Sequence, residues 1–218
     1  MKDMRELFYG AGRHSKKWEN YFQIYEKHFY PYIYKNPTIL EVGVAHGGST
    51  EMLKNYFDQC TIHAVDYDAR FEHVVDSLGV KVTLGDQESQ EFWDHYLFDK
   101  PEFDIIIDDG GHTMQQQIVT LLKTYPKLKE GGTYVVEDTH TSYWKPWGGG
   151  FRDPNTFIEM SKGLIDILHS PHITDISAPQ ELLAIFQDMW SITFYNSIVV
   201  FEKRKSLPSI EANNGKPQ

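Results

Sequence analysis

Residues 39–50 read ILEVGVAHGGST, an apolar run that passes through glycines into a helix-like sequence. The run Thr38–Val44 is predicted to be a buried strand, and Ser49–Phe57 the helix that follows it. Glycines between a strand and a helix let the backbone take positive φ angles and approach a ligand closely. The stretch therefore favours a cofactor-binding turn at the switch point of a parallel sheet, although a plain tight turn would use the same glycines.

Further short apolar runs alternate with longer segments of helical spacing, as in strands joined by crossover helices. The predicted strands are Thr61–Val65, Val80–Leu84, Phe103–Ile107 and Thr133–Val136, and the predicted helices are Ala69–Leu78, Glu88–Phe98 and Met114–Leu128. Near the C-terminus, Ser191–Phe194 and Ile198–Phe201 have the spacing of a β-hairpin. We therefore expect an α/β, Rossmann-like sheet of seven strands, five parallel plus a C-terminal antiparallel hairpin, with helices on both faces.

The length of 218 residues indicates one domain of this kind. Residues 36–204 are expected to form it, and residues 205–218 lose apolar periodicity and are predicted to be a flexible tail. Residues 1–35 are interpreted as a helical lid or interface segment. Within it, the aromatic stripe of residues 18–34 is typical of core or of a dimer contact, so a homodimer is possible.

Composition narrows the class of partner. A formal net charge of −10 argues against nucleic acid and favours a small-molecule or glycan partner. Cys60 is the single cysteine, so neither an intramolecular disulfide nor a cysteine-rich metal site can form. The sequence has no apolar stretch of the length of a signal or membrane span, and we expect a cytoplasmic location.

The spacing Glu41-x-Gly43-x-x-x-Gly47 differs from the dinucleotide pattern G-x-G-x-x-G and favours S-adenosylmethionine (SAM) over NAD. Asp66 ends the second predicted strand, where a carboxylate can accept both ribose hydroxyls. Asp86 is a candidate acceptor for the adenine amino group, with the backbone of Gln87 at the ring edge; a helix N-cap is the alternative for Asp86.

Acidic pairs end the next two predicted strands, Asp108 with Asp109 and Glu137 with Asp138. Carboxyl ends of adjacent parallel strands face one crevice, and four unpaired carboxylates there would repel one another. Hard oxygen ligands favour Mg²⁺, and Asp109, Glu137 and Asp138 are the candidate ligands; helix capping or salt bridges are the alternative for each acid alone. His112, three residues after Asp109, suits a general base.

The loop after the last acidic pair is rich in aromatic residues and glycine. Tyr143 and Trp144 are candidate substrate contacts because aromatic faces suit sugar rings, although Trp144 could equally pack on the domain or at a subunit interface. His140 is a candidate polar contact to the acceptor or to metal-bound water.

Five segments carry a family resemblance: Tyr9-Gly10, Leu40–Gly43, Gly85–Gln87, Ile106–His112 and Val136–Asp138. Together they resemble the macrolide deoxysugar O-methyltransferases and the cephalosporin hydroxylase-like family grouped with them, from about residue 9 to residue 203. The resemblance implies a class I SAM-dependent methyltransferase that methylates a sugar hydroxyl, with Mg²⁺ on Asp109, Glu137 and Asp138 and His112 as base. Tyr9, Ser49 and Asp108 complete the expected cofactor contacts.

Three other functions stay open at this point. A catechol-type O-methyltransferase would use the same cofactor and metal on an aromatic diol. A nicotinamide-binding oxidoreductase is disfavoured by the glycine spacing. A non-catalytic SAM-binding or scaffold protein would have no need of the base and the metal ligands.

Overall fold

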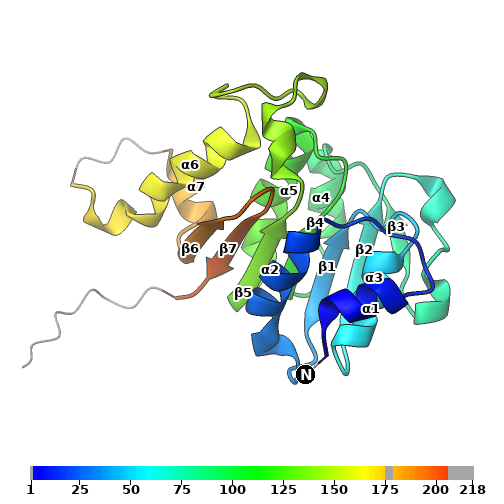
Figure 1. The fold of residues 1–218 in the computed structure, drawn as a ribbon. Helices are drawn as coiled ribbons and strands as arrows, with labels where there is room; N and C mark the ends of the chain where they lie inside the picture. The colour runs from blue at the N-terminus through cyan, green and yellow to red at the C-terminus, as the bar shows by residue number, and fades with distance from the viewer. Residues whose placement is uncertain (1, 175–178, 206–218) are drawn as a thin grey trace, which may run out of the picture.

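In residues 2–174 and 179–205, which the computed structural model describes, seven strands form one mixed sheet (Figure 1). The strand order is β3-β2-β1-β4-β5-β7-β6. The first five strands pair in parallel, and β7 pairs antiparallel with both β5 and β6. The strands are β1 Thr38–Val42, β2 Thr61–Asp66, β3 Val82–Leu84, β4 Phe103–Asp108, β5 Leu128–Val136, β6 Met189–Phe194 and β7 Val199–Lys203. The predicted fold class is confirmed.

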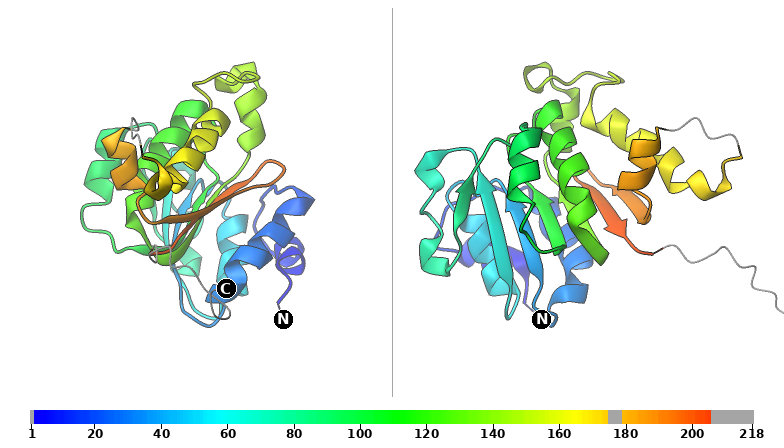
Figure 2. Two further views of the ribbon diagram at one scale, coloured as in Figure 1. Left: turned by 90° about the vertical axis from the view of Figure 1, so that its left-hand side faces the viewer. Right: turned by 180° about the vertical axis from the view of Figure 1, so that it is seen from behind.

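Helices cover both faces of the sheet because successive strand residues point to opposite sides. Ile39 and Ile105 belong to the buried cluster beneath the first three helices, whereas Leu40 and Ile106 belong to a second cluster. Figures 1 and 2 show the helices on the two sides of the sheet. The helices are α1 Met4–Gly10, α2 Glu19–Phe29, α3 Gly48–Tyr56, α4 Gln90–Tyr96, α5 Met114–Thr124, α6 Phe157–Leu168 and α7 Gln180–Ile185. None of the helices in these described ranges is long and apolar enough to cross a membrane.

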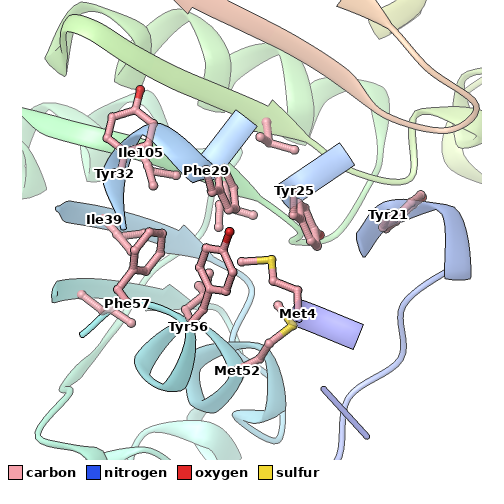
Figure 3. Close-up of a cluster of buried hydrophobic side chains, with 14 of the residues drawn as sticks. Met4, Tyr21, Tyr25, Phe29, Tyr32, Ile39, Met52, Tyr56, Phe57 and Ile105 are labelled. Atoms are coloured by element: carbon pink, nitrogen blue, oxygen red, sulfur yellow. The ribbon is translucent and has the colours of Figure 1, made fainter. Parts of the chain in front are cut away.

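The N-terminal helices are part of the core. Met4 of α1 and Tyr21, Tyr25 and Phe29 of α2 are buried against Ile39 and the first face of the sheet (Figure 3). The aromatic stripe is thus mostly core, while a lid or dimer role stays a prediction. Between the two helices, residues 11–18 form no helix or strand, and we call them the strap. The strap lies across the start of α3, since a Cβ added at Gly48 would come 2.7 Å from the Cβ of Ser15.

Three element predictions are wrong in detail. Residues 69–78 form two short 3-10 turns, Ala69–Phe71 and Asp76–Leu78, instead of one helix. The helix from Met114 ends at Thr124 because Pro126 has no N–H to continue it, and a 3-10 turn follows. Strand β5 already begins at Leu128, with Gly131 and Gly132 inside it. Of the predicted tail, residues 206–218 lie outside the described residues.

Candidate active site

A cavity of about 300 Å³ lies at the carboxyl ends of β1, β2 and β4, where the chain order of the sheet reverses. Gly43 follows β1 with φ +88°, and a Cβ there would lie 2.0 Å from the carbonyl oxygen of Asp109. Only glycine allows the turns after β1 and β4 to meet this closely. The lining residues are Ser15, Val42–Ala45, Ser49, Val65–Tyr67, Phe71, Gly85, Gln87, Asp109–Gly111 and Gln116.

The Asp66 carboxylate lies in this cavity at the end of β2. Its Oδ2 accepts backbone N–H groups of Val44 (2.8 Å) and Ala45 (2.9 Å), and its Oδ1 accepts the N–H of Asp68 (2.9 Å). Three donated hydrogen bonds fix the carboxylate and tie the glycine turn to β2. With two lone-pair sites on each oxygen, Oδ2 is filled by its two donors and Oδ1 keeps one site for a ligand hydroxyl, whereas the sequence interpretation assigned both ribose hydroxyls to Asp66.

Gln87, whose backbone is the predicted contact to the adenine ring, also supports the cavity through its side chain. Its side chain reaches under the turn after β4: Nε2 donates to Asp108 Oδ1 (3.2 Å), and Oε1 accepts the N–H of Gly111 (2.8 Å). It lines the cavity while supporting the cavity wall. Asp86 accepts the N–H of Glu88 at 2.9 Å and is not among the lining residues.

Two predicted cofactor acids are buried behind the cavity wall. Glu41 accepts the hydroxyl of Thr50 at 2.6 Å, and burial raises its pKa to about 7. Burial likewise raises the pKa of Asp108 to about 7. Among the described residues, Glu41 Oε1 and Asp108 Oδ2 have no hydrogen-bond partner. Both acids therefore lie next to the cofactor turns without lining the cavity.

Gly43 and Ser49 line the cavity, but Gly47 and Tyr9 do not. Gly47 has φ +82° and N-caps α3; a Cβ there would come 3.0 Å from the side chain of Arg13 in the strap. Tyr9 is largely exposed and donates a hydrogen bond to Glu19. The structure thus brings four of the nine predicted cofactor residues, Gly43, Ser49, Asp66 and Gln87, to the cavity surface.

Asp109, His112 and Asp138 converge beside the cavity. Each offers a ligand atom, and these atoms all lie within 4.8 Å of one another. His112 Nε2 lies 3.5 Å from Asp138 Oδ2 and 3.8 Å from Asp109 Oδ1. Carboxylate and imidazole donors in this arrangement can hold a divalent cation.

Glu137, the remaining predicted ligand, is bound by two other side chains. Lys17 Nζ lies 2.7 Å from each Glu137 oxygen and 2.5 Å from Asp109 Oδ2, and Tyr25 donates its hydroxyl to Glu137 Oε1. Burial lowers the pKa of Lys17, but the charges of Asp109 and Glu137 outweigh burial and hold the pKa above its ordinary value. Lys17 is therefore an ammonium ion shared by two of the predicted ligands.

Two residues of the group formed by Asp109, His112 and Asp138 have a left-handed backbone conformation. His112 has φ +60° and Asp138 has φ +53°. Thr141 donates its hydroxyl to the carbonyl of His112 at 2.8 Å, and Tyr21 donates its hydroxyl to Asp138 Oδ1 at 2.6 Å. Such non-glycine strain persists where the surroundings hold it and is common at active sites.

Aromatic side chains form the outer wall next to His112. His140 stacks on Trp18 of the strap with ring centroids 4.7 Å apart, and Trp144 meets His140 edge-on at 4.4 Å. His140 Nδ1 lies 2.5 Å from Ser197 Oγ. Trp18 is 42% exposed, Tyr143 48% and Trp144 47%, so part of each ring is open to a ligand.

Sequence reasoning missed several residues of the site. Lys17 and Trp18 come from the strap, and Tyr21 and Tyr25 come from α2. Lys17, Tyr21 and Tyr25 bond to Asp109, Glu137 or Asp138, which lie 92 to 120 residues further along the sequence. Trp18, Tyr21 and Tyr25 belong to the aromatic stripe that was interpreted as core or a dimer contact, and no sequence pattern marked Lys17.

Comparison with known proteins finds methyltransferases. The family model described as a methyltransferase domain matches residues 40–139. An 8-demethyl-8-alpha-L-rhamnosyl tetracenomycin-C 2'-O-methyltransferase from Streptomyces olivaceus is 31% identical over 89% of this chain and 53% of its own length. A mycinamicin VI 2''-O-methyltransferase from Micromonospora griseorubida is 34% identical over 66% of this chain and 38% of its own length. The chain thus spans about half or less of the length of these relatives.

The fold comparison agrees. The MycE methyltransferase of mycinamycin biosynthesis, solved in complex with Mg and SAH, matches 94% of this chain and 55% of its own, with 27% identity and a TM-score of 0.84. A second MycE structure, which also contains mycinamycin VI, has a TM-score of 0.82. Residues 40–139 therefore match a methyltransferase domain, and the chain resembles the tetracenomycin and mycinamicin O-methyltransferases in sequence and the MycE methyltransferase in fold.

Proposed function

We propose that this chain is a SAM- and Mg²⁺-dependent O-methyltransferase that acts on a hydroxyl of a sugar, in a glycoside, a nucleotide sugar or a polysaccharide precursor. The observation that carries the proposal is the convergence of Asp109, His112 and Asp138 beside the cavity under the Gly43 turn. The named activities of the relatives and the Mg and SAH in the MycE structures support it. A cytoplasmic location and a homodimer stay predictions.

In this proposal SAM lies in the cavity and supplies the methyl group. Asp66 Oδ1 accepts a ribose hydroxyl, and the backbone from Gly43 to Ala45 approaches the rest of the cofactor with Ser49 behind it. Glu41, Gly47 and Asp108 shape the turns that form the cavity wall. Tyr9, Asp86 and Gln87 complete the proposed cofactor set; of these three, Gln87 lines the cavity.

A divalent cation fits the carboxylates of this site, because Asp109 and Asp138 offer ligand atoms within 4.8 Å of each other and Glu137 shares the Lys17 ammonium with Asp109. Asp109, Glu137 and Asp138 would hold Mg²⁺, which would draw acceptor hydroxyls in and stabilise negative charge on the oxygen to be methylated. His112 would then serve as base instead of ligand.

The chain's own residues carry the remaining steps. His112 Nε2 accepts the proton of the acceptor hydroxyl. The acceptor oxygen forms a bond to the methyl carbon while the bond from that carbon to sulfur breaks, and S-adenosylhomocysteine leaves. His140, Tyr143 and Trp144 offer aromatic surface to the sugar ring, and Trp18 extends the same wall.

Calorimetry tests the cofactor half of this proposal. S-adenosylhomocysteine should bind with micromolar affinity, whereas NAD⁺ should not bind. Binding of NAD⁺ without binding of S-adenosylhomocysteine would refute it. A panel of glycosides, nucleotide sugars and aromatic diols then identifies the acceptor class, and methylation of the diols alone would favour a catechol-type enzyme.

A further inference from the structure

We infer that Lys17 and a divalent cation compete for the same carboxylate oxygens, so that metal binding releases Lys17 and loosens the strap over the cofactor cavity. The inference rests on the metal site of the proposed function. It concerns a residue of the strap that belongs to neither the predicted ligands nor the predicted cofactor contacts.

The Lys17 ammonium is fully engaged by the acidic cluster. It contacts Asp109 Oδ2 at 2.5 Å and both oxygens of Glu137 at 2.7 Å, which matches its three donor hydrogens. The side chains of Lys17 and Glu137 are each 1% exposed. An ammonium in this position neutralises part of the cluster with a charge that belongs to the chain itself.

A divalent cation at the proposed site needs the same oxygens. Mg²⁺ binds carboxylates directly, at roughly 2.0–2.1 Å, and like charges at such short range repel strongly where water is largely excluded. A cation on Asp109 and Glu137 would therefore lie close to the Lys17 ammonium, which already contacts Asp109 Oδ2 and both Glu137 oxygens. Occupancy by one therefore weakens the other.

Lys17 is also what holds the middle of the strap. At one end Arg13 is anchored by its backbone N–H to Glu51 (3.0 Å) and by its guanidinium to the Val74 carbonyl (3.1 Å) and Ser77 Oγ (2.6 Å). At the other end α2 is anchored in the core. In the part of the chain that the structure describes, Lys17 makes the only side-chain hydrogen bonds or ion pairs of residues 14–18.

Release of Lys17 would therefore act on the cavity. Ser15 lines the cavity two residues before Lys17, and Trp18 stacks on His140 one residue after it. A freed Lys17 leaves this stretch held by the Trp18 stack, by the edge-on contact of His14 with His46 and by the anchors at Arg13 and α2. Exchange of Lys17 for a divalent cation thus links the charge of the metal site to the covering of both the cofactor cavity and the aromatic wall.

The unmodified protein provides the first test, by amine labelling with mass-spectrometric detection. In chelator the buried Lys17 should react slowly, and with saturating Mg²⁺ its labelling rate should rise roughly ten-fold or more, because the released state becomes dominant. Lys16 is exposed and is the internal control, whose rate should stay constant. Unchanged protection of Lys17 at saturating Mg²⁺ would overturn the inference.

The second test compares Mn²⁺ affinity of two matched variants by electron paramagnetic resonance of the free ion. Lys17→Met removes the competing ammonium and should bind Mn²⁺ roughly ten-fold more tightly than the parent, because the competing internal state is gone. Lys16→Met makes the same change on an exposed neighbour and should bind like the parent.

The two possible failures are distinguishable. Equal or weaker Mn²⁺ binding by Lys17→Met, in a parent that binds the ion, would refute the competition and leave the metal site intact. A parent that binds no Mn²⁺ would refute the metal site itself. If Lys17→Met does not fold, the labelling of the parent decides.

Discussion

Replacing Gly43 with Ala should lower both the stability of the fold and the affinity for the cofactor. The control Gly79→Ala separates the cost of left-handed strain from the cost of the steric clash. Both glycines have positive φ, +88° and +70°. A Cβ at position 79 would meet nothing within 4 Å, whereas one at position 43 would lie 2.0 Å from the Asp109 carbonyl oxygen. Gly79→Ala should cost only left-handed strain, about 1–2 kcal/mol. Gly43→Ala adds the displacement of the turn after β4, about 1–3 kcal/mol more.

Calorimetric unfolding and S-adenosylhomocysteine titration check this pair. At roughly 2–4 °C per kcal/mol for a chain of this size, Gly79→Ala should lower Tm by several degrees and Gly43→Ala by about twice that. The affinity for S-adenosylhomocysteine should stay unchanged in Gly79→Ala. It should fall at least about ten-fold in Gly43→Ala, since a loss of about 1.4 kcal/mol of binding free energy from the displaced turn suffices. Equal Tm values together with undiminished binding in both variants would refute the close approach of the two turns.

Three further predictions address the base, the cofactor contact and a buried acid. His112→Ala should lower the rate of methyl transfer by about 10²- to 10⁴-fold and leave Mn²⁺ affinity nearly unchanged; loss of Mn²⁺ binding would show that His112 is a ligand and not a base. Asp66→Ala should weaken S-adenosylhomocysteine binding by about 1.5–3 kcal/mol in calorimetry, with Asp68→Ala as the neighbouring control, and equal losses in both would contradict the ribose contact. Glu41 has a folded-state pKa of about 7, above its ordinary value of 4.5, so the native state retains its proton and stability falls as pH rises between these values. Glu41→Gln should remove up to about 3 kcal/mol of that fall in urea unfolding at about pH 5 and about pH 8, and an unaltered pH dependence would speak against a buried, titrating Glu41.

The sequence predicted the sheet well because its strands contain short continuous apolar runs that alternate with segments of helical spacing. The sequence prediction failed where other features override the helical spacing of apolar residues. Residues 69–78 have helical spacing but form two 3-10 turns, and residues 114–128 continue a helical pattern past the point where Pro126 ends the helix. Helix α6, Phe157–Leu168, was not predicted, although Thr156 accepts the N–H of Glu159 as its N-cap.

The candidate site was predictable to the extent that residues at strand ends must share one crevice. That rule brought Asp109, Asp138 and His112 together correctly as a group, although their separate roles are proposals. It could not find Lys17, whose partners lie 92 and 120 residues away and whose burial depends on the path of the strap. A lysine in an irregular segment is ordinarily solvated, so no local pattern marks it as buried.

The central claim is methyl transfer from SAM to a sugar hydroxyl with the help of a divalent cation. Its most direct measurement is mass spectrometry of the protein incubated with SAM, Mg²⁺ and a panel of glycosides and nucleotide sugars, with and without a chelator. The account predicts S-adenosylhomocysteine and a sugar carrying one additional methyl group, both abolished by the chelator. A methylated sugar that forms at the same rate in excess chelator would contradict the mechanism proposed for Asp109, Glu137 and Asp138.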